Sequence, residues 1–122
     1  MSTGKLLIHA MRDVTIVNFE DTAILDAAVV ESIGAQLYEL VDARHTQKLV
    51  LDFTKVKFLS SSALGVLINL RNKAARIKGA LVVCGLRPDL MKVFEITNLK
   101  KLFTFRANEE EALAEFGVTT AG

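Results

Sequence analysis

Residues 49–70 read Leu-Val-Leu-Asp-Phe-Thr-Lys-Val-Lys-Phe-Leu-Ser-Ser-Ser-Ala-Leu-Gly-Val-Leu-Ile-Asn-Leu, which is the most informative stretch of the chain. The apolar run at 48–53 has polar flanks and predicts a strand buried on both faces, as in a parallel sheet. After a short connector, Ser60-Ser61-Ser62 opens an apolar helix predicted over 60–78. A strand that leads through a connector into a helix is the repeating unit of a parallel α/β sheet.

The segments on both sides of this stretch continue the alternation of strands and helices. On the N-terminal side the pattern predicts a hairpin of strands 6–8 and 14–19, turned at Arg12-Asp13, a loop at 20–23, and a helix over 27–44. On the C-terminal side it predicts strand 80–84, helix 88–96, strand 103–105 and helix 109–116. The order β-β-α-β-α-β-α-β-α predicts an α/β fold with a mixed, mostly parallel sheet, helices packed against it and the first strand at an edge.

The expected helix ends carry residues with known end preferences. Asp26 and Asn108 are expected to cap the first and last helices. Gly79 is expected to end the second helix as a C′ glycine, and Pro88 suits the first turn of the third. Asn98 can close that third helix, because asparagine tolerates the left-handed conformation.

Length and composition limit the classes of protein to consider. A chain of 122 residues fits one domain spanning 1–122, with an ordered core over about 5–117 and a frayed tail at 118–122. A net charge of +1 without a basic stripe argues against a nucleic-acid partner. Cys84 is the only cysteine, which favours a reducing, cytoplasmic location and a buried core role. No run approaches the ~18 apolar residues of a membrane span, so no direct membrane insertion is expected.

The usual catalytic and ligand-binding motifs are missing from the sequence. There is no Gly-x-Gly-x-x-Gly, no Gly-x-x-x-x-Gly-Lys-Ser/Thr phosphate loop and no Gly-x-Ser-x-Gly elbow. His9 and His45 are not spaced as a metal pair, and one cysteine cannot build a zinc knuckle. We therefore expect neither an enzyme nor a bound cofactor or metal ion.

The serine run combines three physical features. A serine before a helix caps its free amides, and those amides together with the helix dipole favour a negative group such as phosphate. The run also follows a strand, at the sheet edge where open α/β folds place ligands. One side chain suffices for a cap, so three serines exceed the structural need. The residues alone leave both a plain cap and a regulatory site open.

This segment resembles the signature of the STAS domain family, to which bacterial anti-sigma-factor antagonists belong. The family's typical run is a hydrophobic strand ending Asp-x-Ser/Thr, then Val-x-Phe-hydrophobic-Asp-Ser-Ser-Gly-Leu-Gly-hydrophobic-Leu. The matching residues are Asp52, Thr54, Val56, Phe58, Leu59, Ser61, Ser62, Leu64, Gly65, Val66 and Leu67. Further matches are Leu25-Asp26-Ala27, Gly85-Leu86-Arg87-Pro88 and the run at 93–99. Ser60 stands where the family has an acidic residue, and Ala63 where it has glycine.

The resemblance implies a regulatory binding protein. The unmodified form would bind an anti-sigma factor with serine kinase activity and so release a sigma factor. Phosphorylation at Ser61, with Ser60 and Ser62 as alternative acceptors, would separate the complex, and a phosphatase would reset it. Ser60 is expected to act as the helix cap. The partner-binding residues implied are Asp26, Ser60, Ser61, Ser62, Leu64, Gly65 and Arg87.

Two other functions stay open. The chain could be a non-phosphorylated STAS scaffold subunit of a stress-sensing or lipid-transport assembly. Weak nucleotide binding is a third reading, which the missing phosphate loop disfavours. Asp26 is either a helix cap or a partner contact, and Arg87 is either a solvated side chain or part of a phosphate or partner site.

Overall fold

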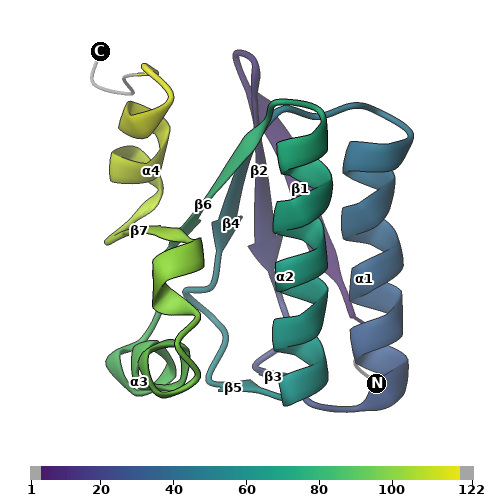
Figure 1. The fold of residues 1–122 in the computed structure, drawn as a ribbon, viewed down its shortest axis with the longest axis vertical. Coiled ribbons are helices and arrows are strands. Elements are labelled where there is room, and N and C mark those ends of the chain that lie inside the picture. The colour runs from purple at the N-terminus through teal and green to yellow at the C-terminus, as the bar shows by residue number, and fades with distance from the viewer. Residues whose placement is uncertain (1–3, 119–122) are drawn as a thin grey trace.

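The computed structural model describes residues 4–118 and places the strands in one main sheet, in the order β1-β2-β4-β6-β7 (Figure 1). The strands are β1 (Leu6–Met11), β2 (Val14–Phe19), β4 (Lys48–Asp52), β6 (Ala80–Cys84) and β7 (Thr104–Arg106). β1 pairs antiparallel with β2, and the remaining pairs are parallel. The prediction of a mostly parallel α/β sheet with an N-terminal hairpin at its edge is confirmed.

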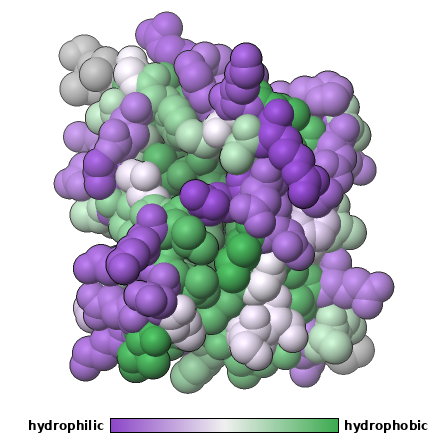
Figure 2. Space-filling view, in the orientation of Figure 1, coloured by the Kyte–Doolittle hydropathy of each residue, from purple (hydrophilic) through white to green (hydrophobic). Residues whose placement is uncertain are grey.

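The helices lie on both faces of this sheet. They are α1 (Ala27–Asp42), α2 (Ser61–Arg76), α3 (Pro88–Ile96) and α4 (Glu109–Glu115), with a short 3-10 turn, η1 (Lys100–Leu102). Figure 1 shows α1 and α2 side by side, with their first turns at the same end of the molecule. In space-filling form this face has a band of apolar residues between α2 and the segment of α3 and β7 (Figure 2).

Side chains alternate between the two faces of the sheet along each strand, and this divides the interior into two cores. In β2, Val17 and Phe19 face the first core, beneath α1, α2 and α3, and the rings of Phe19 and Phe53 stack there at 4.4 Å. Val14 and Ile16, on the opposite face of β2, point into the second core, which α4 closes with Ala112 and Leu113. β4 and β6 are therefore apolar on both sides, as the continuous apolar run at 48–53 predicts.

A second, two-stranded sheet was missed by the sequence reading. β3 (Ala23–Ile24) pairs in parallel with β5 (Phe58–Leu59), where we expected a loop and a connector. Strands of two residues are too short to show a period, so only the tertiary pairing defines them. This small sheet ties the chain before α1 to the chain before α2.

The ends of α2 correct one prediction. The helix runs from Ser61 to Arg76, and Lys78, not Gly79, adopts the left-handed conformation at its C-terminal end, with φ of 60°. Gly79 has another role: a Cβ there would lie 2.7 Å from the carbonyl oxygen of Gln47. The glycine thus allows two backbones to approach at the start of β6, rather than ending the helix.

The other predicted ends agree in most cases. Pro88 opens α3, Asn98 has φ of 65° after it, and Asn108 caps α4 by accepting a hydrogen bond from the Glu111 N–H at 2.9 Å. Asp26 occupies the N-cap position of α1, but its side chain makes no capping hydrogen bond, so that prediction is wrong.

The remaining boundaries differ by a few residues. β1 extends past residue 8 to Met11, and α1 stops two residues before the predicted 44. The expected frayed tail is wrong at Val118, which is 4% exposed in the second core, and positions 119–122 lie outside the described residues. Among residues 4–118, no helix is both long and apolar enough to cross a membrane.

Candidate functional site

The start of α2 is held by Ser60. Its backbone N–H donates to the Ile24 carbonyl at 3.0 Å, which continues the β3–β5 pairing by one residue. Its Oγ accepts from the Ala63 N–H at 3.1 Å, and its carbonyl accepts from the Leu64 N–H at 3.1 Å. The prediction that Ser60 caps the helix is confirmed, because its Oγ accepts from a backbone N–H of the first turn, while its own N–H holds the helix start to the small sheet.

Ser61 and Ser62 are the first two residues of α2, and both are exposed. Within residues 4–118, neither their hydroxyls nor their backbone N–H groups have a hydrogen-bond partner. The first turn of α2 carries no acidic residue that would neutralise the positive end of the helix dipole. Two open amides and a free hydroxyl therefore meet at an electropositive helix terminus, which suits a negatively charged group.

The small β3–β5 sheet brings the start of α1 next to this terminus. Asp26 is exposed there, and with no capping bond its carboxylate is open to solvent. Two large apolar side chains flank the same place, Leu25 at 51% exposed and Phe58 at 55%. Apolar residues this open on a globular surface are typical of contact surfaces for other molecules.

A groove between α1 and α2 opens beside the serines. It encloses about 420 Å³, and its lining residues are Ala27, Val30, Glu31, Gly34, Ala35, Tyr38, Ser62 and Val66. Gly34 lies on the floor of this groove, and a Cβ there would make an ordinary van der Waals contact of 3.4 Å with a Val66 methyl group. Ser62 thus belongs both to the helix start and to this mostly apolar groove.

The other predicted partner residues are placed differently. Leu64 is only 6% exposed and packs in the first core. The prediction that it contacts a partner is therefore wrong, and its side chain instead supports the start of α2 from the core. Gly65 is half-buried on α2, with no atom within 4 Å of the position of a Cβ. Arg87 is exposed just before α3, where its guanidinium lies 3.5 Å from the Asp89 carboxylate. No hydrogen bond or ion pair in the described part of the chain joins Arg87 to the serines.

A buried polar cluster beneath α4 was missed by the sequence reading. Asp52 is 8% exposed, and its Oδ1 accepts from the Thr54 N–H at 2.8 Å and the Thr54 hydroxyl at 2.5 Å. The Asn18 side-chain amide donates to Asp52 Oδ2 at 3.2 Å and to Glu109 Oε2 at 2.6 Å. The available signal was a polar residue near the C-terminal end of each of two mostly apolar strands, Asn18 in β2 and Asp52 in β4, which pair directly across the sheet.

The pKa values of the two carboxyl groups in this cluster are shifted in opposite directions. A hydrogen bond with Asp52, aided by burial, raises the pKa of Glu109. Burial works to raise the pKa of Asp52 as well, but hydrogen bonds from Glu109 and Thr54 outweigh it and lower that pKa. Asp52 is therefore the more acidic of the two carboxyl groups, and Glu109 is the less acidic one. Nearby, burial raises the pKa of the Cys84 thiol to about 12, as expected for an unreactive core cysteine.

Comparisons with known proteins identify the domain family. The model of the STAS domain family matches residues 8–112. BtrV of Bordetella bronchiseptica, named as an anti-sigma factor antagonist, is 30% identical over 93 residues, covering 76% of this chain and 79% of that protein. The anti-sigma F factor antagonist of Paenibacillus polymyxa is 26% identical over 96 residues, covering 79% of this chain and 82% of that protein.

Solved structures share the fold at lower identity. A Thermotoga maritima protein described as an anti-sigma factor antagonist superposes with a TM-score of 0.81 at 17% identity, over 93% of this chain and 95% of that one. The anti-sigma factor antagonist SpoIIAA in its unphosphorylated form gives a TM-score of 0.71 at 19% identity, over 93% and 98% of the chains. The Bacillus SpoIIAA structure in the phosphorylated form gives 0.71 at 20% identity, over 92% and 99%.

Proposed function

The chain belongs to the STAS domain family, and from that premise we propose that it is an anti-sigma-factor antagonist switched by phosphorylation of Ser61. In its unmodified form it binds an anti-sigma factor with serine kinase activity, and the sigma factor is released. Phosphate on Ser61 ends the complex, and a phosphatase restores it. These partners imply action in the cytoplasm.

One observation favours Ser61 over Ser60 as the phosphate acceptor. Ser60 uses its hydroxyl to cap α2, whereas Ser61 presents a free hydroxyl at an exposed helix start. A phosphate on Ser61 would meet the open amides of the first turn and the positive end of the dipole, so the fold need not rearrange to hold it. That SpoIIAA has been solved in a phosphorylated form supports a phosphate on this fold.

The surroundings of Ser61 support a protein partner. Exposed Leu25 and Phe58 supply apolar area that a protein partner would cover, and Asp26 adds a charge at the margin. We include Ser60, Ser62, Gly65 and Arg87 in the contact surface, because the first three lie on or beside the same helix start and Arg87 lies at the start of the next helix. Leu64 supports this surface from below.

The effect of phosphorylation on binding follows from charge and size. Phosphate adds about −1.5 to −2 charge at pH 7 and replaces a small hydroxyl by a bulky group. Burying that charge against a partner surface shaped for the hydroxyl costs several kcal/mol, which is enough to dissociate a complex of micromolar affinity. The helix amides stabilise the phosphate only while the partner is absent.

The test uses two substitutions at Ser61 and a control on α4, which packs on the second core and not on the face that carries α2. Ser61→Asp should abolish binding to an anti-sigma factor with serine kinase activity from the same genome, whereas Ser61→Ala and the control Glu110→Gln should keep it, as measured by isothermal titration calorimetry. Incubation of the wild-type chain with that partner and ATP should add one phosphate by intact mass, and Ser61→Ala should prevent it. Equal binding by Ser61→Asp and Ser61→Ala, with no added mass, would exclude the switch and support the scaffold subunit instead.

A further inference from the structure

Strand β1 is an edge strand whose outer side has no partner among residues 4–118. It pairs with β2 over its full length, from Leu6 opposite Phe19 to Met11 opposite Val14. Its other side therefore presents a row of free backbone N–H and C=O groups. Such a row is satisfied best by another extended strand, which supplies the matching donors and acceptors.

This edge lacks the features by which proteins usually block pairing. Residues 6–11 contain no proline, no lysine and no formal charge, with His9 as the only titratable side chain. The strand holds three of the six large apolar side chains that are exposed in residues 4–118: Leu7 at 46%, Ile8 at 40% and Met11 at 39%. The opposite edge of the sheet, β7, has three residues and ends in Arg106, so the two edges differ sharply.

We propose that β1 pairs antiparallel with β1 of a second copy of this chain, so that two five-stranded sheets join into one across a two-fold axis. The axis runs perpendicular to the sheet and keeps each side chain on its own face, so odd-numbered residues face odd-numbered ones. Leu7, His9 and Met11 lie on the face of the second core, because His9 pairs with Ile16 and Met11 with Val14.

The apolar side chains select one register for this pairing. When His9 faces His9 of the second copy, Leu7 faces Met11 on both sides of the axis, and Ile8 faces Ala10 on the other face of the sheet. Every exposed apolar side chain of the strand then has an apolar neighbour. A shift by one pair would place Leu7 against His9 and Met11 against Lys5, leaving those apolar groups beside polar ones.

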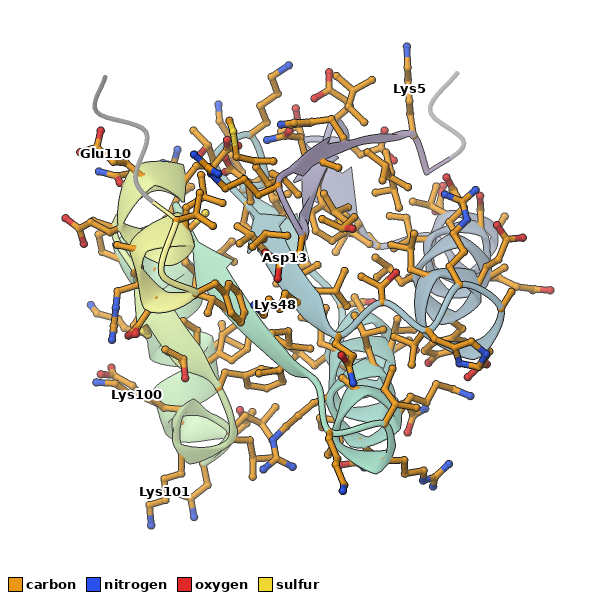
Figure 3. The ribbon with its side chains drawn as sticks, turned by 90° about the horizontal axis from the view of Figure 1, so that it is seen from above. Lys5, Asp13, Lys48, Lys100, Lys101 and Glu110 are labelled. Atoms are coloured by element: carbon orange, nitrogen blue, oxygen red, sulfur yellow. The ribbon has the colours of Figure 1, made fainter. Side chains whose placement is uncertain are left out.

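The flanks of the strand limit this pairing to residues 6–11. Lys5 precedes β1, and Arg12 and Asp13 form the two-residue turn that leads into β2. The Asp13 carboxylate accepts from Lys48 of β4 at 2.6 Å, on the side of β2 away from the open edge. Figure 3 shows β1 at the margin of the molecule, between α1 and α4, with Lys5 extending away from the body. The pairing leaves the start of α2 uncovered, so it is independent of the function proposed above.

Analytical ultracentrifugation of the full chain over a wide concentration range tests the pairing. We expect a discrete equilibrium between one and two copies, without larger assemblies, because the two-fold contact uses the only long free edge of the described sheet. Leu7→Lys should weaken the dimer by about tenfold or more, since it removes two symmetric apolar pairs and introduces charge. Leu25→Lys is the matched control, equally exposed at 51% but outside β1, and should leave the dimer unchanged.

A cysteine placed on the proposed two-fold axis tests the register of the β1–β1 pairing. In a Cys84→Ser background, which removes the native thiol, His9→Cys should form a disulfide between copies under mild oxidation, because directly opposed Cα atoms lie about 4.5–5.5 Å apart. Ile8→Cys should not, because its own copy lies on the diagonal, roughly 7–8 Å away. Non-reducing electrophoresis separates the two results.

Three outcomes would overturn the proposal. The first is a single-copy mass at every concentration with no His9→Cys crosslink. The second is a dimer that Leu7→Lys and Leu25→Lys leave equally intact. The third is a crosslink through Ile8→Cys in place of His9→Cys, which would reject the register. Circular dichroism of each variant tests whether the fold is retained, so that loss of the dimer can be distinguished from unfolding.

Discussion

Two polar clusters lie where strands of the sheet end, and they differ in almost every physical respect. The serine run at the start of α2 faces solvent, and Ser61 has no hydrogen-bond partner in the described chain. The cluster of Asp52, Asn18 and Glu109 beneath α4 is largely buried and joins three elements through short hydrogen bonds.

The difference separates residues that build the fold from a residue left free to act. A buried carboxylate costs free energy unless its acceptors are satisfied, so the Asp52 cluster exists only because β2, β4 and α4 meet around it. An exposed hydroxyl costs nothing to leave unpaired. We therefore expect substitutions in the buried cluster to change stability, and substitutions at Ser61 to change binding alone.

The largest expected effect is that of Asp52→Ala. It removes the acceptor of the Thr54 N–H and hydroxyl and of the Asn18 amide, and leaves these donors near the interior. The free energy of unfolding should fall by about 2–4 kcal/mol, measured by urea denaturation. Asp89→Ala is the matched control: this aspartate is 66% exposed in an ion pair with Arg87, and its loss should cost less than about 0.5 kcal/mol. Equal losses in the two variants would contradict the contrast.

A smaller effect separates the serines from each other. Ser60→Ala removes the cap of α2 and should lower the free energy of unfolding by about 1 kcal/mol. Ser60→Asp should retain most of that stability, since aspartate caps equally well. Ser61→Ala should change stability by less than about 0.5 kcal/mol, because its hydroxyl makes no contact in residues 4–118. Thermal and urea unfolding of the three variants rank them, and a stability loss at Ser61 matching that at Ser60 would remove the distinction.

The smallest effect is in the pH dependence of stability. Because the pKa of Glu109 is raised from its ordinary 4.5, its contribution to stability is full below that value and is lost as pH rises through the raised pKa. The lowered pKa of Asp52 acts in a separate window, below its ordinary 3.8, where stability is lost as pH falls. Glu109→Gln should abolish the loss of stability that the wild type shows as pH rises. The free energy of unfolding of the variant should therefore increase relative to that of the wild type as pH increases above 4.5.

The control for this experiment lies next to it on the same helix. Glu110→Gln changes an exposed carboxylate that lies at the outer margin of the molecule, and its stability profile should follow the wild type (Figure 3). Urea denaturation at a series of pH values gives both profiles. A Glu109→Gln profile that also falls over this range would show that the raised pKa of Glu109 is not the cause of the loss.

Much of the site was predictable because its signals are local. The cap at Ser60 depends on a serine before an apolar helix, and the exposure of Ser61 follows from its place at the first helical position. The sequence could not show that Asp26 lacks its expected capping bond. An aspartate before a helix is the same local signal whether or not its side chain accepts from the helix amides. Leu64 was misplaced because motif membership does not say which face of a helix a residue occupies.

The sequence by itself determined the alternation of strands and helices, the parallel sheet and the serine run at a helix start, since all of these depend on residues close together in the chain. Only the tertiary structure decided the β3–β5 pairing, the hydrogen bonds of Asn18 to Asp52 and Glu109, and the burial of Leu64. Each of these brings together residues that are far apart in the chain. Their energies depend on distance and burial, which are defined only once the elements have packed.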